Sequence, residues 1–520
     1  MLMRVRVTDK ISVDDAALWM PGSNILITSP MGSGKSYFCK NTLYSIAKEA
    51  NGKILMLIHR SNCVEQFKYE IEIDGKVNVI EVRTYQALEY HKLHNTKNQI
   101  DLSKYQFIVC DEFHYFFEDS KFNNKTAVSF KMIMANKESV HVFMSATGDG
   151  MANYMKSYTK KNGLPKPVEY KIPFDYSFIK KLNFFYKEET IEQILKNRIA
   201  KGEKGIFFIY KAEDAYKLYK KYKDYCVFNC SANNKTYYQY VDKEKIKNIL
   251  INQRFEEQFL ITTACFDAGI NIIDREVKHI VLDIVDTGSL IQCIGRKRIQ
   301  DDEDKVNVYI KAMNNQKLAG FKRSTEEKVQ MAEYFQKNDC SVEKLIERYP
   351  MQNDLNNILY DDLAYDSNGE IIPNTYRKSI NELMYFKKKN DIADYSTMMK
   401  SGKFGYCKYM ANLLGAYDEK TGSYTYSMIK EDYELETYLA RLVKEDTVFL
   451  QLKDRVELIK KINAKQDGKL LKKAATLNQV LEERELDFRI KEFETTRMIQ
   501  DTNGEPKKKK YKNAWKIVKF

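Results

Sequence analysis

The sequence predicts an α/β protein in which two tandem parallel-sheet domains precede a mainly helical region and a C-terminal helix-and-hairpin unit. Its 520 residues exceed what one hydrophobic core normally organises, so several domains are expected. Short apolar runs alternate with helix-compatible stretches in two successive series, which is typical of parallel sheets covered by helices. Beyond residue 315 such runs thin out. The expected domains are residues 1–165, 166–315, 316–475 and 476–520.

Apolar runs mark the expected strands of the two sheets. The first series comprises residues 24–28, 53–59, 77–84, 107–110 and 140–147. The second series comprises residues 204–210, 225–230, 258–264, 277–285 and 305–312. Between them lies NGLPKPVEY (162–170), whose glycine and prolines predict a domain boundary. In the third region, residues 433–462 carry apolar side chains at helical spacing and predict a pair of packed helices.

A glycine-rich loop follows the first expected strand, in the sequence SPMGSGKS. Glycine permits the dihedrals and the close approach that let backbone N–H groups surround a phosphate chain. Lys35 stands where an ammonium reaches the outer phosphates, and the Ser36 hydroxyl is a suitable Mg²⁺ ligand. The pattern begins at Ser29 instead of the usual glycine, and a surface turn rich in small residues is the alternative. The predicted nucleotide-binding residues are Pro30, Met31, Gly32, Ser33, Gly34, Lys35 and Ser36.

An acidic pair stands at the end of the fourth expected strand, in VCDEFHYFF. The carboxyl ends of parallel strands face the ligand crevice of such a sheet. There, Asp111 can hold hydrated Mg²⁺, and Glu112 can orient and deprotonate an attacking water. Either carboxylate could instead cap a helix. The position after an apolar strand, about 75 residues beyond the glycine-rich loop, favours the catalytic interpretation.

With Asp-Glu-Phe-His, in which His114 completes the motif, the chain resembles a superfamily 2 helicase of the D-E-x-H box type. Further motifs in the family's order extend the resemblance over roughly residues 20 to 312. The resemblance implies two RecA-like domains that enclose ATP and Mg²⁺, with nucleic acid crossing both domains on another face. The residues that match these further motifs are Arg60, Thr84, Ser145, Thr147, Thr263, Gly269, Asn271, Gln292, Gly295 and Arg296.

The resemblance also implies a role for each motif. Gly269 and Asn271 are expected at the nucleotide, and Gln292 is expected among the catalytic residues. The residues expected to bind nucleic acid, or to couple hydrolysis to movement along it, are Arg60, Thr84, His114, Ser145, Thr147 and Thr263.

The sixth motif departs from the family pattern Q-x-x-G-R-x-x-R. Ile299 occupies the place of the second arginine, and Arg298 stands one residue earlier. Relatives that resemble viral origin-binding helicases have a similar G-R-x-R form. We therefore assign Arg296 as the arginine finger that meets transition-state charge. Arg298 is a second candidate catalytic residue, with a solvated charge or an ion pair as the alternative.

The C-terminal segment predicts a small winged-helix-like unit. Two strand-like runs, residues 488–499 and 509–520, flank Asn503-Gly504, which is a strong hairpin signal. From residue 506 onward the chain has seven lysines and no acidic side chain. Lysines neutralise phosphates and an aromatic ring can stack on a base, although a solvated basic end and a core anchor for the hairpin are the alternatives. The predicted nucleic-acid contacts are Lys508, Lys510 and Trp515.

The formal net charge of +13 suits a polyanionic partner such as nucleic acid, although the abundance of Lys, Asn, Ile and Tyr also fits AT-rich coding. No apolar run is long enough to span a membrane, and the N-terminus lacks the pattern of a signal peptide. We therefore expect a cytoplasmic protein without a membrane partner, located in the bacterial host if a phage encodes it.

Together these features predict an ATP-dependent helicase or translocase that acts on DNA in preference to RNA. The context expected for it is replication of a bacteriophage or mobile element, with a replication protein as a possible partner. The alternatives are an RNA helicase and an ATP-switched DNA-binding initiator or remodeller that does not separate strands. The sequence lacks the histidines that an HNH or HD nuclease centre needs, because no histidine follows His279 and no His-Asp dipeptide occurs. A carboxylate-lysine nuclease stays open.

Overall fold

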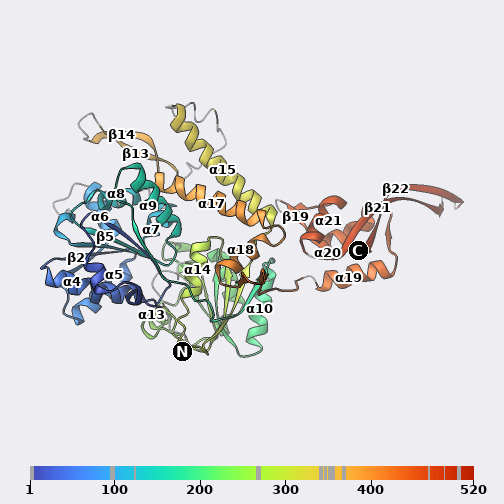
Figure 1. Ribbon diagram of the computed structural model, residues 1–520. Coiled ribbons are helices and arrows are strands. Elements are labelled where there is room, and N and C mark those ends of the chain that lie inside the picture. The colour runs from blue at the N-terminus through green and yellow to red at the C-terminus, as the bar shows by residue number, and fades with distance from the viewer. Residues whose placement is uncertain are drawn as a thin grey trace. The chain divides into compact units, whose positions relative to one another are not determined.

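A computed structural model gives the structure of the protein (Figure 1). The residues that it describes are 5–93, 100–121, 125–264, 271–338, 344, 348, 358–365, 371–431, 433–466, 469–484, 486–500 and 505–519. The chain divides into two compact units. The larger comprises Met1–Phe184 and Ile191–Ser427, and the smaller comprises Phe185–Thr190 and Met428–Phe520. Among the described helices, none has the length and apolar character that crossing a membrane requires.

The first sheet of the larger unit has six described strands in the order β3-β2-β4-β5-β1-β6. Its central pairings are parallel, β1 with β5 and β6, and β4 with β2 and β5. Five of the strands confirm the first predicted series. The sixth, β6, begins in the segment predicted as a domain boundary. It was not predicted as a strand, because its partly exposed residues form no apolar run. The strands are β1 (Asn24–Thr28), β2 (Ile54–Ile58), β3 (Ile80–Thr84), β4 (Phe107–Asp111), β5 (Val140–Ser145) and β6 (Val168–Lys171).

Side chains that alternate across this sheet build two cores, one on each face. In β1 all five residues are buried, with Ile25 and Ile27 in one hydrophobic cluster and Leu26 in the other. Burial on both faces explains why these strands read as continuous apolar runs. The helices that cover the sheet or connect its strands are α1 (Val7–Lys10), α2 (Val13–Ala17), α3 (Lys35–Tyr37), α4 (Tyr44–Glu49), α5 (Ser61–Ile73), α6 (Tyr85–Leu93), α7 (Tyr115–Glu118), α8 (Thr126–Ala135) and α9 (Asp149–Lys161).

The second sheet has seven described strands in the order β17-β7-β12-β11-β8-β10-β9. Its β8, β9, β10, β11 and β12 confirm the second predicted series and pair in parallel. Strands β7 and β17 extend the sheet beyond β12 and were not predicted. The strands are β7 (Ile179–Phe185), β8 (Lys204–Ile209), β9 (Cys226–Asn229), β10 (Phe259–Thr262), β11 (Val277–Asp283), β12 (Val306–Lys311) and β17 (Tyr426–Met428). The helices are α10 (Glu189–Ile199), α11 (Ala212–Lys221), α12 (Lys235–Tyr238), α13 (Lys243–Asn252) and α14 (Thr287–Gly295).

The described chain between β12 and β17 forms helices together with two antiparallel strand pairs, β13–β14 and β15–β16. Helix α17 packs on the first domain, because Leu383 belongs to one of the two cores of the first sheet. Its other side meets α15, since Met384 clusters with Val329 and Ala332 (Figure 1). The elements are α15 (Asn315–Asn338), β13 (Leu359–Tyr365), β14 (Ile371–Ile380), α17 (Glu382–Lys400), α18 (Gly405–Leu413), β15 (Tyr417–Asp418) and β16 (Ser423–Tyr424).

The smaller unit runs helix, strand, helix, two short strands, helix, strand, strand around its own core. Its three-stranded sheet has the order β18-β22-β21, and the helices α19 and α20 form the predicted pair, with the short strand β18 between them. The predicted Asn503-Gly504 turn lies outside the described residues. The elements are α19 (Tyr433–Lys444), β18 (Val448–Phe449), α20 (Val456–Ile462), β19 (Lys465–Gln466), β20 (Lys469–Leu470), α21 (Ala474–Glu483), β21 (Phe488–Gln500) and β22 (Pro506–Lys519).

The placement of Trp515 corrects one prediction. Its side chain is only 2% exposed and lies in the core of the smaller unit with Ile490 and Ile517. The indole Nε1 donates to Glu492 Oε1 at 2.9 Å, and the Arg455 guanidinium lies 4.0 Å from the ring centroid. The strand register turns this ring inward, so no indole face is available to a nucleic-acid base. Trp515 is the core anchor of the hairpin, which was the alternative interpretation.

Candidate active site

A cleft of about 410 Å³ lies between the two parallel-sheet domains of the larger unit. The first domain contributes the loop after β1, the segment after β2 and the segment after β4. The second domain contributes α14 and the residues that follow it. Most residues predicted for nucleotide binding or catalysis line this cleft: Met31, Gly32, Gly34, Lys35, Ser36, Asp111, Glu112, Asn271, Gln292, Arg296 and Arg298.

The glycine-rich loop has the backbone that its sequence predicts. Gly32 and Gly34 have φ of +76° and +88°, a region that residues with a Cβ rarely enter. Among the described residues, none beyond the neighbours of Gly34 in the chain has an atom within 4 Å of the place where a Cβ of Gly34 would stand, so the loop leaves space on that side. Lys35 is buried, and its Nζ donates to the Ser29 and Pro30 carbonyls at 3.2 Å each. The loop thus holds an ammonium group at its own mouth.

The acidic pair lies at the carboxyl end of β4. Glu112 has φ of +50°, a strained value for a residue with a side chain. Burial raises the pKa of Asp111 to about 7, and the neighbouring Glu112 charge adds to the shift. Burial also opposes ionisation of Glu112, but the hydrogen bond with His114 and the charges of Lys35 and Arg296 hold the pKa of Glu112 well below its ordinary value. Glu112 is therefore ionised at neutral pH, as a general base must be.

His114 connects the acidic pair to both domains. Its Nδ1 lies 2.8 Å from Ser145 Oγ and 3.3 Å from Glu112 Oε2. On its other side, Gln292 Nε2 donates to His114 Nε2 at 2.8 Å and to Thr147 Oγ1 at 3.2 Å. The His114 ring therefore lies between Gln292 of the second domain and Glu112 of the first.

Helix α14 lies along the first domain over its whole length. Its N-cap residue Asp286 accepts the Ser289 N–H at 2.9 Å, which fixes the first turn. A Cβ on Gly288 would stand 3.8 Å from Thr147 Cβ. At the other end, a Cβ on Gly295 would meet the Met31 side chain, so this end of the helix lies close to the glycine-rich loop.

Two arginines follow from the end of α14 and differ in their surroundings. Arg296 is buried, and its Nε has no hydrogen-bond partner in the described part of the chain. Arg298 Nε donates to Asn271 Oδ1 at 2.7 Å, and a Cβ on Gly32 would stand 3.5 Å from its guanidinium. Arg298 is therefore held against the loop, whereas Arg296 lines the cleft and its charge lowers the pKa of Glu112.

The remaining predicted residues lie around the cleft or beyond it. Arg60 lines the cleft beside His59. Thr84 ends β3, and its hydroxyl accepts the Ala87 N–H at 3.1 Å at the start of α6. Thr263 follows β10 and is nearly buried. Ser33 and Pro30 shape the loop from within, since the Ser33 hydroxyl donates to the Pro30 carbonyl at 2.7 Å. The predicted Gly269 lies outside the described residues.

Sequence reasoning missed three charged side chains around α14. Glu118 and Asp119 follow the acidic motif by one helical turn and line the cleft. Lys387, on α17, contacts Glu118 and Asp286. The sequence pattern Asp-x-x-Ser at Asp286 is a helix-start signal that would have located the cap. Nothing local marks Lys387, because its partners are distant in the sequence.

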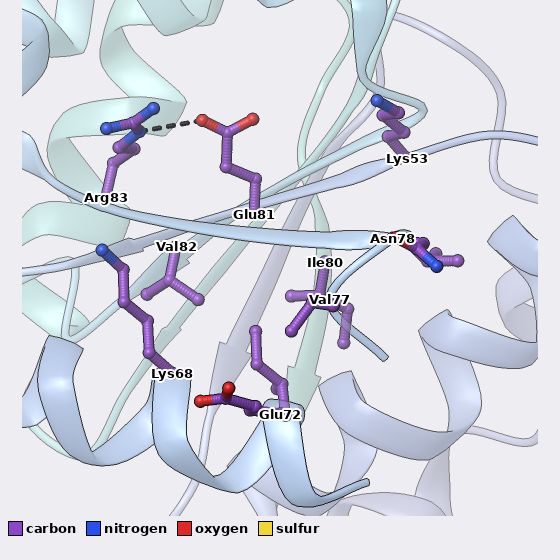
Figure 2. Close-up of a pocket in the computed structure, with 11 residues that line it drawn as sticks. Lys53, Lys68, Glu72, Val77, Asn78, Ile80, Glu81, Val82 and Arg83 are labelled. Atoms are coloured by element: carbon purple, nitrogen blue, oxygen red, sulfur yellow. Dashed lines mark hydrogen bonds and ion pairs between the residues drawn. The ribbon is translucent and has the colours of Figure 1, made fainter. Parts of the chain in front are cut away.

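A second hollow, of about 460 Å³, lies at the outer edge of the first sheet (Figure 2). It is lined by strand β3, by part of α5 and by Lys53. Lys68, Glu72, Glu81 and Arg83 surround it, and Arg83 Nε donates to Glu81 Oε1 at 2.8 Å (Figure 2). No residue predicted for the active site lines this hollow.

The donors in the cleft fit a nucleotide with Mg²⁺. A loop with free space beside Gly34 and a lysine at its mouth suits a phosphate chain. The Ser36 hydroxyl and the Asp111 carboxylate line the same cleft, and oxygen atoms of these kinds are the ligands that Mg²⁺ prefers.

Parts of this chain are similar to known proteins. The pattern of the family described as "Type III restriction enzyme, res subunit" matches residues 10–149. Similar solved structures include S. cerevisiae Dbp5 bound to RNA and ADP BeF3, at 17% identity and TM-score 0.44, covering 61% of this chain and 88% of that chain. The DUF1998 helicase MrfA bound to DNA and AMPPNP is 16% identical with TM-score 0.42, covering 56% and 47%. The Pyrococcus furiosus Hef helicase domain is 14% identical with TM-score 0.36, covering 62% and 100%.

A search of curated proteins found no match. The family match includes both the glycine-rich loop and the acidic pair. Both of these features line the cleft described above.

Proposed function

We propose that the protein is a Mg²⁺-dependent ATPase that moves along DNA or separates its strands. The observation that carries the proposal is the position of α14. This helix of the second domain brings Gln292 and Arg296 into the cleft that the first domain builds from its glycine-rich loop and acidic pair. A site completed by two domains can couple hydrolysis to their relative movement.

The proposal gives each side chain of the cleft a task. Lys35 and the loop N–H groups bind the phosphates, and Ser36 and Asp111 hold Mg²⁺, which supplies charge neutralisation at the phosphates. Glu112 orients the attacking water and takes its proton. Arg296 is the finger that stabilises transition-state charge, because its guanidinium lines the cleft and its charge acts on Glu112. Asn271 holds Arg298 beside the loop.

Movement follows from the His114 connection. While Gln292 is bonded to His114 and Thr147, the second domain is fixed against the base. Loss of the terminal phosphate removes the charge that Arg296 neutralises and weakens the hold between the domains. We propose that Thr84 and Thr263 face the nucleic acid, which a cycle of closing and opening displaces along the two domains, and that Arg60, which lines the cleft, couples hydrolysis to this movement.

One ATPase experiment tests the proposal. Steady-state hydrolysis is measured with Mg²⁺ alone and with single-stranded DNA, duplex DNA or RNA added separately. We expect DNA to raise kcat more than RNA does. Stimulation by RNA alone would establish the RNA-helicase alternative, and absence of hydrolysis under all conditions would refute the proposal.

The smaller unit favours a second function, DNA binding outside the motor cleft. We infer a winged-helix-like unit from its three helices and the hairpin β21–β22, although the short strand pair β19–β20 lies between α20 and α21. In the part of β22 that precedes Tyr511, the side chains are exposed, including those of Lys507, Lys508, Lys509 and Lys510. Lys510 pairs with Glu494 at 2.6 Å, which leaves the other three lysines facing solvent. DNA binding without strand separation would make the protein a remodeller instead of a helicase. A duplex-unwinding assay distinguishes these two functions.

We expect replacement of Lys507, Lys508 and Lys509 by Gln to weaken DNA binding and its salt dependence. Each lost phosphate contact lowers the log–log slope of affinity against salt by about 0.7 to 0.9. Titrations at several salt concentrations measure this slope. Substitution is preferable to deletion of the hairpin, because deletion would remove Trp515 and Ile517 from the core.

The matched control is Gln at Lys453, Lys460 and Lys461, which are exposed lysines of the same unit outside the hairpin. It removes the same formal charge. Equal slopes for the hairpin variant and the wild-type protein would remove the hairpin from the DNA-binding surface. DNA-independent ATPase activity should be unchanged in both variants.

The replication context belongs to the same proposal. It is supported by the G-R-x-R form of the sixth motif, with Arg296 and Arg298, which resembles that of viral origin-binding helicases. We propose a role in bacteriophage or mobile-element replication with a replication protein as partner, and copurification from phage-infected cells would test it.

A further inference from the structure

Lys387 is a buried cation on α17, outside every helicase motif of the sequence. Its side chain is only 9% exposed. The helix that carries it is anchored on the first domain, where Leu383 enters the core and the Phe386 ring lies 6.2 Å from that of Phe117. This anchoring gives the ammonium group a defined position.

The Lys387 ammonium meets a carboxylate from each motor domain. Its Nζ lies 3.6 Å from Glu118 Oε1, at the end of α7 and in the wall of the ATP cleft. It also lies 3.6 Å from Asp286 Oδ2, on the N-cap of α14. Asp391, one turn further along α17, accepts from the same Nζ at 3.1 Å.

A charge in this position requires partners. Burial opposes the charged form of a lysine, but the carboxylates of Glu118, Asp286 and Asp391 outweigh it and raise the pKa of Lys387 well above its ordinary value. The group therefore stays protonated at any physiological pH. Removal of this charge would take away an attraction that the Glu118 and Asp286 carboxylates, one from each motor domain, both share.

The carboxylate on α14 has a direct connection to the catalytic groups. Asp286 fixes the first turn of the helix whose later residues include Gln292 and whose end positions Arg296. A helix of this length moves as a rigid rod. A contact that holds its N-terminus on the first domain therefore also holds Gln292 against His114 and Arg296 in the cleft.

We propose that Lys387 is a positioning residue that holds α14 against the first domain, so that ATP turnover depends on the region between β12 and β17. The inference rests on the proposed ATPase function. It assigns to α17 the task of linking that region to domain closure. Any movement of α17, for example on binding of nucleic acid or a partner to this region, would then change the rate of hydrolysis.

The test compares Lys387→Met with Lys389→Met in the full-length protein. Methionine keeps much of the length and removes the charge. Lys389, on the same helix, is about half exposed and pairs with Glu333 at 3.1 Å, so it is a matched control. We expect Lys387→Met to lower kcat by about tenfold or more, in the range of typical coupling between sites. The KM for ATP should change little, because the first domain binds the phosphates.

A double-variant cycle separates positioning from a merely structural effect. Asparagine is as good an N-cap as aspartate, so Asp286→Asn keeps the start of α14 and removes only its charge. We expect Asp286→Asn to lower kcat as well. Combined with Lys387→Met, its effect should be less than the product of the two single effects, because both remove the same contact.

The outcomes distinguish this inference from the function on which it rests. Hydrolysis by the wild-type protein that Lys35→Ala abolishes, but that Lys387→Met and Lys389→Met leave equally fast, would overturn the role of Lys387 alone. Fully multiplicative effects of Lys387→Met and Asp286→Asn would also overturn it. If Lys387→Met does not fold, Asp286→Asn carries the test, and wild-type kcat in that variant refutes the inference. Absence of hydrolysis in the wild-type protein would refute both proposals.

Discussion

Lys35→Ala and Glu112→Gln are both expected to abolish ATP hydrolysis, but they should differ in nucleotide binding. Lys35 is the ammonium at the mouth of the glycine-rich loop, so its loss removes attraction for the phosphates and weakens ATP binding. Glu112→Gln keeps the side-chain volume and removes the base, which costs about 10² to 10⁴ in rate. This variant should bind ATP as the wild-type protein does and hold nucleic acid in a closed complex.

The measurements are steady-state hydrolysis, binding of a fluorescent ATP analogue, and retention of labelled DNA with ATP present. Lys48→Ala is the matched control for Lys35→Ala, because Lys48 is exposed and lies in the helical segment that follows the loop. Wild-type turnover in either active-site variant would show that the cleft is not the catalytic site.

Arg296→Ala should lower kcat by about 10³-fold, with a smaller change in nucleotide affinity. The expectation follows from its place in the wall of the cleft and from the effect of its charge on Glu112. Arg298→Ala should be milder and should act mainly on KM, because Arg298 lies against the glycine-rich loop and is held by Asn271. Single-turnover kinetics separate the chemical step from binding.

Arg275→Ala is the control for the two arginine variants, because Arg275 is an exposed residue that pairs with Asp301. If Arg298→Ala is the crippled variant and Arg296→Ala turns over normally, the arginine finger is Arg298. The sixth motif would then place its catalytic arginine at the second position of G-R-x-R.

Local sequence signals predicted the part of the site that local structure makes. The glycine-rich loop needs Gly32 and Gly34 for its positive φ values, and these glycines are visible in the sequence. The acidic pair stands at the end of an apolar strand, so its place at the edge of the sheet followed from topology. The strands with both faces buried were also predicted correctly, because continuous apolar runs in the sequence mark them.

Features that depend on tertiary contacts were not predictable in this way. Strand β6 is partly exposed and has no apolar run, so only its pairing with β1 defines it. Lys387 is one of many lysines, and only the fold brings it to Glu118 and Asp286. For Trp515, the register of β22 decides between core and surface, and the sequence left both interpretations open.

Strand β17 has a consequence for how the protein is made on the ribosome. The second sheet has β17 at one edge, beside β7, yet Tyr426–Met428 leaves the ribosome long after β12 ends at Lys311. At a synthesis rate of roughly 5 to 20 residues per second, this delay is on the order of ten seconds. During that interval the first domain has all its strands, while β7 is an open edge that can pair with other chains. Nascent chains stalled between these positions should therefore aggregate or recruit chaperones more than chains stalled after residue 428.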